Sequence, residues 1–297
     1  MSCRSNKSYT ATMMTFLVAF WGAGVALWVS AGAAQETNPH ADVLSIGGSV
    51  TEIVYALEQE HRLIARDTTS TYPPNATRLP DVGYMRALSP EGVLSVRPEL
   101  IISEDGAGPP ETLEILEQAS IPFVVISDDY SRQGVVSKIR AVGAALGATE
   151  RAETLAKEVG AQLDEAVVKA SVHEGAPKKV LFILSTQGGR ILASGTNTAA
   201  DGIIRLAGAV NAVTQFEGYK PMTDEAISAA APDVILMMDR SSDHSAANDE
   251  LFAMPAIVTT PAAKDRAVVR MNGLYLLGFG PRTAEAVLDL NTALYGS

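Results

Sequence analysis

The apolar and polar positions of the chain alternate between strand-like and helix-like spacing from residue 42 onward. Helical patterns separate the strand-like runs, and the first of these patterns, over residues 51–57, has Ile53, Val54 and Leu57 on one face. The same alternation restarts at residues 179–184, so the pattern predicts βαβ units and largely parallel sheets in two halves. The apolar runs of strand length in the first half lie at residues 43–46, 62–65, 100–102 and 123–126.

The two halves share a repeated unit of a helix, a proline and a strand. Residues 88–102 align with residues 222–236 at a constant offset of 134 positions. Each copy has an N-cap residue type, an acidic residue in the first helical turn and a proline that ends the helix before an apolar strand. These residues are Ser89, Glu91 and Pro98 in the first half and Thr223, Glu225 and Pro232 in the second.

A long amphipathic helix is predicted between the halves, over residues 149–171. Its apolar stripe recurs every four residues, and Thr149 is a residue type that caps helices. A helix of this length spans about 34 Å. An ordinary surface helix would explain the stripe but not its position at the midpoint of the repeat. The stripe consists of Leu155, Val159, Leu163 and Val167.

The fold class predicted from these patterns is α/β, with two Rossmann-like lobes joined by one long interdomain helix. The expected boundaries are residues 42–148 for the N-terminal lobe, 149–171 for the linking helix and 175–297 for the C-terminal lobe.

The first 33 residues differ in composition from the rest of the chain. They begin with basic Arg4 and Lys7, continue with an apolar run over residues 16–29 and end in small residues at 31–33. These three parts are typical of a secretory signal peptide, so we expect residues 1–33 to be cleaved on export. An uncleaved membrane anchor is the alternative, since the apolar run is only slightly short for one.

Composition excludes several classes of function. The chain has 297 residues and a net charge of −11, which argues against a nucleic-acid partner held through phosphates. Its single cysteine, Cys3, lies in the predicted signal peptide, so no disulfide framework, thiolate metal site or iron–sulfur cluster is expected. The four histidines show no ligand spacing, and the common phosphate-loop, zinc-protease and serine-hydrolase motifs are missing.

The loop-like segment 67–89 follows a predicted strand and carries the most informative residues. In a parallel α/β lobe, loops that follow strands form the edge that faces the ligand. Tyr84 and Arg86 are two positions apart in a stretch expected to be extended, so their side chains would point the same way. An arginine and a ferric ion both favour a phenolate, and tyrosine is a known axial ligand of haem. The residues alone leave open a simple packing role for Tyr84.

Several segments resemble the haem-binding proteins that serve bacterial haem ABC importers, which belong to the helical-backbone (class III) periplasmic binding proteins. The resemblance extends over essentially the whole chain after the signal peptide, and the Tyr-x-Arg segment is its most specific part. It implies a non-enzymatic periplasmic protein whose two lobes hold haem in the cleft between them. The segments are residues 46–52, 66–73, 83–94, 106–110 and 278–282.

The resemblance also implies roles for individual residues. Tyr84 matches the axial ligand of the haem iron, Arg86 the residue that hydrogen-bonds its oxygen, and Arg240 an arginine of the second lobe's cleft. Some family members add an axial histidine from the loop that here reads as residues 185–188, which contain none. We therefore expect Tyr84 to act alone or with a weak sixth partner.

The other wall of the cleft is expected to come from residues 194–198 and 216–220, whose backbone N–H groups, with Lys220, would meet haem propionates.

Glu91 and Glu225 have two interpretations. An acidic residue in the first turn of a helix complements the helix dipole, which alone explains either residue. The resemblance adds a second role, in which one glutamate on each lobe docks arginines of a permease dimer in the inner membrane. It also implies that an outer-membrane receptor hands over the haem.

Two rival functions remain open at this point. The nearest is a binder of ferric siderophore or cobalamin with the same fold, which needs no Tyr-x-Arg pair. The other is a periplasmic haem-handling enzyme, which would need a redox-active or oxygen-activating group that the matched loops do not offer.

Overall fold

The computed structural model describes residue 40, residues 42–239 and residues 245–296, with the side chains of 245–247 left out. All of these residues belong to one compact unit, residues 37–297. The predicted signal peptide and Arg240 lie outside the described residues.

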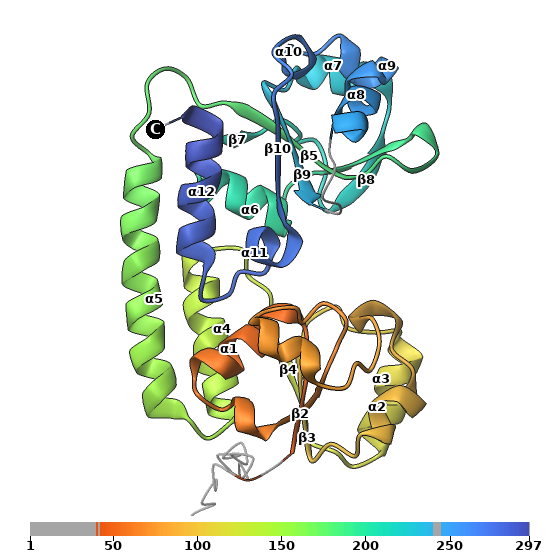
Figure 1. The fold of residues 1–297 in the computed structure, drawn as a ribbon, viewed down its shortest axis with the longest axis vertical. Coiled ribbons are helices and arrows are strands. Elements are labelled where there is room, and N and C mark those ends of the chain that lie inside the picture. The colour runs from red at the N-terminus through yellow and green to blue at the C-terminus, as the bar shows by residue number, and fades with distance from the viewer. Residues whose placement is uncertain (1–39, 41, 240–244, 297) are drawn as a thin grey trace, which may run out of the picture. The chain divides into compact units, whose positions relative to one another are not determined.

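The N-terminal lobe is built on a four-stranded sheet in which every pairing is parallel (Figure 1). The strand order is β2-β1-β3-β4, so the predicted crossover connections are confirmed. The strands are β1 (Val43–Ile46), β2 (Leu63–Arg66), β3 (Leu100–Glu104) and β4 (Phe123–Ile126). The helices are α1 (Gly48–Ala56), α2 (Pro90–Ser95), α3 (Pro110–Gln118) and α4 (Arg132–Ala145), with short 3-10 turns at Glu60–Arg62, Pro74–Arg78 and Met85–Ala87.

The long helix α5 (Thr149–Ala170) bridges the two lobes. It packs against α4 of the N-terminal lobe and against α12 of the C-terminal lobe, as the ribbon shows (Figure 1). Its stripe is buried at Leu155, Val159 and Leu163. Ala148 takes the N-cap position, without a side-chain hydrogen bond, so the sequence prediction of Thr149 as the cap is wrong.

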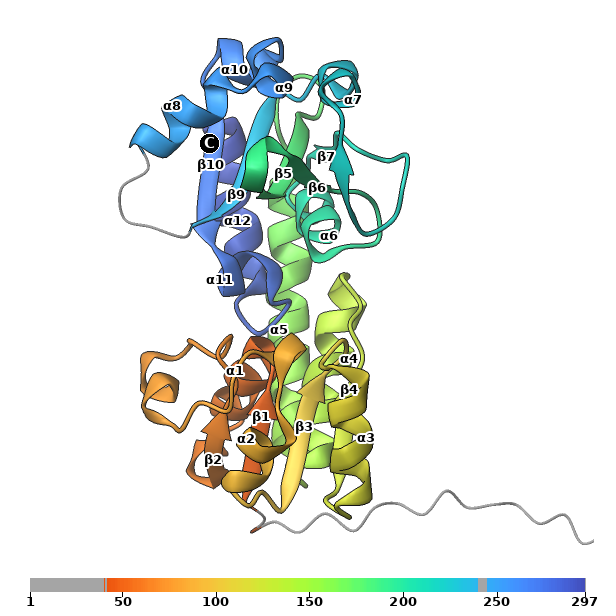
Figure 2. The same ribbon diagram turned by 90° about the vertical axis from the view of Figure 1, so that its right-hand side faces the viewer.

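The C-terminal lobe contains a mixed sheet of six strands, in the order β10-β9-β5-β6-β8, with β7 paired to β5 (Figure 2). β7, β9 and β10 run parallel to β5, whereas β6 is antiparallel to both β5 and β8. The connection from β5 to β6 is too short for a crossover helix, so it forms a hairpin, which the prediction of largely parallel sheets missed. The strands are β5 (Lys179–Ser185), β6 (Ile191–Ser194), β7 (Val210–Asn211), β8 (Tyr219–Met222), β9 (Val234–Asp239) and β10 (Val268–Asn272).

Helices cover this second sheet. They are α6 (Ala199–Leu206), α7 (Asp224–Ala230), α8 (Ser245–Ala253), α9 (Pro255–Val258), α10 (Pro261–Lys264), α11 (Gly273–Leu277) and α12 (Thr283–Tyr295), with a 3-10 turn at Gln187–Gly189. None of the helices in the described part of the chain is long and apolar enough to cross a membrane.

The predicted repeat is present in both lobes. The Ser89 hydroxyl accepts a hydrogen bond from the Gly92 N–H at 3.0 Å, and the Thr223 hydroxyl accepts one from the Ala226 N–H at 3.2 Å. α2 then leads to β3 and α7 to β9, each across the proline predicted to end the helix. The N-cap prediction is therefore confirmed in both copies.

The largest hydrophobic core runs through both lobes without a break. It includes Val43 and Ile53 of the N-terminal lobe, Leu163 of α5, and Phe182 and Ile203 of the C-terminal lobe, all fully buried. Each lobe also has one smaller core of its own. The lobes thus share apolar surface through α5 and α12 instead of meeting only at their polar edges.

Candidate functional site

The segment that leads to Tyr84 is held against the end of β2. The Arg66 N–H donates to the Pro80 carbonyl, the Val82 N–H to the Arg66 carbonyl and the Thr68 N–H to the Gly83 carbonyl. Gly83 has φ of +105°, a backbone conformation that glycine adopts at little cost and other residues rarely do. The backbone that leads into Tyr84 is therefore hydrogen-bonded to the end of β2.

Tyr84 and Arg86 form a direct pair. The Arg86 Nη1 donates a hydrogen bond of 3.0 Å to the Tyr84 hydroxyl, and Tyr84 is 44% exposed. Met85, between them, is buried and fixes the segment in the lobe's core. The two side chains meet because residues 85–87 form a 3-10 turn, not the extended stretch that the sequence suggested.

Arg86 remains a cation at this position. Burial, the largest single effect, would lower the pKa of Arg86, and the hydrogen bond and charge of the Tyr84 phenol oppose it. Tyr130 and Glu104 add smaller effects in the same direction, and the net pKa lies above the ordinary arginine value. A fixed positive charge therefore faces the Tyr84 oxygen.

The charge of Arg86 acts on two further tyrosines. Tyr130 precedes α4, and its ring packs edge-on against Phe279 of the C-terminal lobe, with centroids 5.4 Å apart. Burial, with a smaller effect of the Asp128 charge, raises the pKa of Tyr130 to about 12. Tyr219 is the first residue of β8 in the C-terminal lobe and is 37% exposed. The charge of Arg86 has a lowering effect on the pKa of Tyr219, which burial outweighs. We call Tyr84, Arg86, Tyr130 and Tyr219 the tyrosine group.

A buried ionic cluster lies next to the tyrosine group, where the lobes meet. The Lys138 ammonium is 2% exposed and donates to the Asp128 carboxylate at 2.8 Å and to the Ser49 hydroxyl at 3.0 Å. It also donates to the carbonyl of Gly278, which belongs to the C-terminal lobe, at 3.3 Å. Glu104, 3.7 Å from Lys138, accepts hydrogen bonds from Ser49, and burial raises its pKa against the opposing effect of Lys138. Through the hydrogen bond from Lys138 to Gly278, the cluster links α4 to the loop before α12.

A second polar contact between the lobes joins Glu52 of α1 to Arg282. The Arg282 Nε and Nη2 donate to the two oxygens of the Glu52 carboxylate at 3.0 and 2.7 Å. The guanidinium carbon lies 3.4 Å from the centroid of the Tyr72 ring and 5.1 Å from that of Tyr275. A cavity of about 400 Å³ opens beside this contact. The segments 66–73 and 278–282, which stood out in the sequence, therefore join the lobes.

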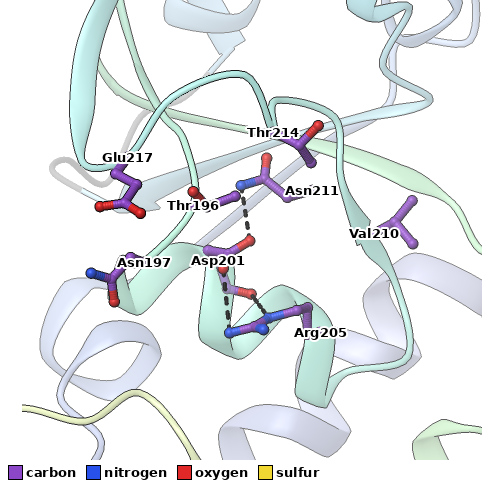
Figure 3. Close-up of a pocket in the computed structure, with 8 residues that line it drawn as sticks. All are labelled: Thr196, Asn197, Asp201, Arg205, Val210, Asn211, Thr214 and Glu217. Carbon is purple, nitrogen blue, oxygen red and sulfur yellow. Dashed lines mark hydrogen bonds and ion pairs between the residues drawn. The ribbon is translucent and has the colours of Figure 1, made fainter.

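A polar pocket of about 430 Å³ lies beside α6 (Figure 3). Its inner groups pair with one another, since the Asn211 Nδ2 donates to Asp201 at 3.1 Å and Arg205 lies 3.3 Å from the same carboxylate. The pocket is lined by Thr196, Asn197, Asp201, Arg205, Val210, Asn211, Thr214 and Glu217.

The loops expected to form the second wall bind each other through their backbones. The N–H groups of Gly195, Thr196 and Gly218 donate to carbonyls at 2.8 to 3.0 Å within this loop pair. The expectation that these N–H groups meet haem propionates is therefore wrong for these three. The Lys220 ammonium lies over the Phe216 ring, 5.4 Å from its centroid, on an exposed side chain.

Glu91 and Glu225 are both exposed, each in the first turn of its helix. Hydrogen bonds from its own backbone N–H and from the Thr223 hydroxyl lower the pKa of Glu225, so this residue contributes to the helix cap. Their matched places on α2 and α7 are as the repeat predicts.

Sequence reasoning missed several residues of this region. Tyr130 follows β4, as the segment that carries Tyr84 follows β2. The rule that loops after parallel strands face the ligand would therefore have indicated Tyr130 as well. Lys138 lies on the apolar face of α4 between Val135 and Ile139, and a lysine at such a position signals a buried ionic contact. Within the described ranges, no three histidine, cysteine, aspartate or glutamate side chains gather to hold a metal ion.

Two α/β lobes bridged by one long helix define a class III periplasmic binding protein. The chain belongs to the periplasmic binding protein family, whose model matches residues 43–273. Proteins of this family are transport receptors and not enzymes, so the enzymatic alternative is set aside.

Individual relatives agree with this assignment. The chain is 38% identical to the periplasmic haem-binding protein RhuT from Roseiflexus sp. RS-1, over 86% of this chain and 97% of that one, with a TM-score of 0.81. It is 26% identical to the ABC transporter substrate-binding lipoprotein YvrC of Bacillus subtilis, over 85% of this chain and 79% of the relative. It is 27% identical to the vitamin B12-binding protein of Pectobacterium atrosepticum, over 95% and 96%. The protein is a periplasmic substrate-binding protein of an ABC importer.

Proposed function

We propose that the protein captures ferric haem between its lobes and delivers it to an ABC importer of the inner membrane. The observation that carries the proposal is the exposed Tyr84 phenol with the Arg86 guanidinium 3.0 Å from its oxygen. A phenolate is a hard anionic ligand suited to Fe(III), and a hydrogen bond from a neighbouring cation fixes the direction of the ligand.

The residues that interact with Arg86 suit a flat, largely apolar ligand with acidic groups. Tyr130 and Tyr219 supply aromatic surface, and Arg86 supplies positive charge. Arg240, placed directly after β9 by the sequence, is proposed as the arginine of the second lobe that meets the haem propionates.

The comparisons support haem over the rival ligands. The haem-binding relative is 38% identical, against 27% for the vitamin B12-binding relative. The latter match covers nearly the whole chain, so cobalamin is retained as the second candidate.

Delivery is proposed to use Glu91 and Glu225. These exposed carboxylates occupy equivalent places on the two lobes, which suits a permease with two-fold symmetry. The double charge reversal Glu91→Lys with Glu225→Lys should abolish haem import in cells while hemin binding by the purified protein is unchanged. Loss of binding in this variant, or normal import, would contradict the docking role.

The proposal includes export. Residues 1–33 would be removed as a signal peptide, leaving lobes at 42–148 and 175–297 and the linking helix at 149–171 in the periplasm. Haem would reach the protein from an outer-membrane receptor.

The direct test is an absorption titration of the protein lacking residues 1–33 with hemin. The wild type should give a high-spin ferric spectrum with an iron–phenolate charge-transfer band, and Tyr84→Phe should lose or weaken that band. Tyr55→Phe, which removes the hydroxyl of a half-buried tyrosine in α1, is the matched control. A spectrum that is the same for the Tyr84 variant and the wild type would exclude Tyr84 as the ligand.

The rival ligands need a separate measurement. Hemin, cyanocobalamin and a ferric siderophore should be compared by thermal shift on the same protein. A ligand that binds the native state raises the unfolding temperature more the more tightly it binds at a given concentration, so a larger shift with cyanocobalamin than with hemin at equal concentration would favour the second candidate.

A further inference from the structure

Phe279 lies between the two lobes in a backbone conformation that bulky residues rarely adopt. It belongs to the loop 278–282 before α12, has a φ of +50° and is 2% exposed. Its ring packs edge-on against Tyr130, which follows β4 of the N-terminal lobe. A strained backbone of this kind persists only where the surrounding structure enforces it. The contacts around Phe279 therefore fix its position.

Gly202 is the residue of the C-terminal lobe that meets both Tyr130 and Phe279. It lies in α6, which faces the loop before α4 (Figure 2). A Cβ atom at position 202 would lie 2.5 Å from the Tyr130 carbonyl oxygen and 2.9 Å from the Phe279 Cζ. Both distances are shorter than real Cβ contacts, so α6 can approach the N-terminal lobe this closely only with glycine here.

The conformation of α6 does not explain this glycine. Gly202 is a buried residue in the middle of the helix, and its φ is not positive. Alanine could adopt the same backbone and would favour the helix more than glycine does. The contact between the lobes is therefore the reason that this position has no side chain.

Polar contacts hold the same junction at both ends of the loop 278–282. The Lys138 ammonium donates to the Gly278 carbonyl at 3.3 Å, and the Arg282 Nη2 donates to the Glu52 carboxylate at 2.7 Å. These bonds hold the loop against the N-terminal lobe, while the contact of Gly202 limits how closely α6 can approach. The lobes are thus held together by polar bonds and kept at one spacing by a steric contact.

We propose that Gly202 sets the spacing of the two lobes, and through it the fit of a flat ligand in the cleft between them. The inference rests on the proposed function, since it takes haem as that ligand. Gly202 is then a positioning residue that acts through the walls of the cleft and does not itself touch the haem.

The effect on the ligand follows from the short range of dispersion forces. A flat macrocycle gains contacts on both of its faces only when both walls reach it. A gap of about 0.5–1 Å already removes about a quarter to a half of the attraction between facing atoms. Any side chain at position 202 would need a displacement of about 1 Å to reach an ordinary van der Waals distance from Tyr130. Even alanine should therefore weaken binding.

The test uses the protein lacking residues 1–33, which contains no cysteine because Cys3 is the only one in the chain. Glu114→Cys on α3 and Ala229→Cys on α7 provide one exposed position for a spin label on each lobe. The distance between the labels is measured without hemin by double electron–electron resonance. Hemin affinity is measured by absorption titration, and both measurements are repeated for Gly202→Ala and Gly202→Val.

Gly143→Ala is the matched control. Gly143 lies in α4, and a Cβ atom there would overlap the Ala152 side chain of α5, so this substitution also strains a buried helix contact. The contact does not involve the C-terminal lobe. Circular dichroism and the urea midpoint show that each variant is folded and how much stability it has lost.

The label distance should lengthen from wild type to Gly202→Ala to Gly202→Val. Hemin affinity should fall in the same order, by about tenfold for Gly202→Val. Gly143→Ala should lose stability but keep the label distance and the hemin affinity of the wild type. If Gly202→Val does not fold, Gly202→Ala decides alone. A folded Gly202 variant with the wild-type label distance, or with the wild-type hemin affinity, would overturn the proposal.

Failure of this inference is distinguishable from failure of the proposed function, because the label distance is measured without ligand. If the distance responds to Gly202→Ala and the wild type binds no hemin, the proposed function fails and Gly202 still sets the spacing. If the wild type binds hemin and the distance does not respond, Gly202 has no such role although haem remains the cargo.

Discussion

The contact between Glu52 and Arg282 should contribute more to stability than any exposed ion pair of similar geometry. Both oxygens of the carboxylate are hydrogen-bonded by the guanidinium, and the Arg282 N–H adds a third bond at 3.2 Å. The side chains are only 6% and 20% exposed, so removing one partner leaves the other charged group with little access to water. The substitution Arg282→Ala tests this by leaving the Glu52 carboxylate without its cation.

The magnitude follows from burial. Removing one member of a buried ion pair typically costs about 3–5 kcal/mol, because the remaining charge is uncompensated. Arg282 retains some contact with water, so we expect the lower end of this range, about 3 kcal/mol. Its stacking on Tyr72, at 3.4 Å, adds a cation–π contribution of about 1 kcal/mol that the same substitution removes. For a chain of this size the combined loss of about 4 kcal/mol corresponds to a fall of roughly 8–16 °C in the unfolding temperature.

The assay is urea unfolding followed by circular dichroism, with a matched control. Arg140 and Glu153 form an equally close two-point pair, at 2.7 and 3.0 Å, but with side chains 45% and 39% exposed. Arg140→Ala should therefore change the free energy of unfolding much less. In the double variant Glu52→Gln with Arg282→Ala, the destabilisation should be smaller than the sum of the single effects. Equal effects of Arg282→Ala and Arg140→Ala would refute the argument that burial strengthens this contact.

Three other measurements test separate parts of the structure. Ser89→Ala removes the side-chain cap of α2 and should lower the free energy of unfolding by about 1 kcal/mol in urea titrations. Leu163→Ala empties a fully buried position of α5 and should cost about 2–5 kcal/mol by the same method, and an effect below about 1 kcal/mol would show that this face of α5 is not packed. Because burial raises the pKa of Tyr130 to about 12, the unfolded chain loses this proton near pH 10 while the folded protein keeps it. Stability should therefore fall as pH rises between these values, and the urea midpoint of Tyr130→Phe should fall less steeply over that range than the midpoint of the wild type.

The fold was predictable where local patterns determine it. The N-cap residues Ser89 and Thr223 and the prolines that follow their helices mark one unit in each lobe, and the stripe from Leu155 to Leu163 marks α5. The hairpin of β5 and β6 was not predicted, because β6 has only four residues and its direction depends on the turn at Gln187–Gly189.

The candidate site was predictable only in part, for a related reason. Tyr84 and Arg86 are two positions apart, so their contact follows from local geometry. Glu52 and Arg282 are 230 positions apart, and Lys138 and Gly278 are 140 apart, so only the folded chain shows that they meet. The electrostatic interaction between Tyr219 and Arg86 is likewise visible only in the folded chain, because the two residues belong to different lobes.

The unbroken apolar core has a consequence for how this chain can be divided. A cut in the exposed turn at residues 172–178 would separate α5 from α12 and expose the buried faces of both. Each fragment alone would expose a large apolar surface and tend to aggregate, although each contains its own sheet. When the fragments are produced together, they should associate through the contact between α5 and α12. The two halves should therefore behave as one folding unit.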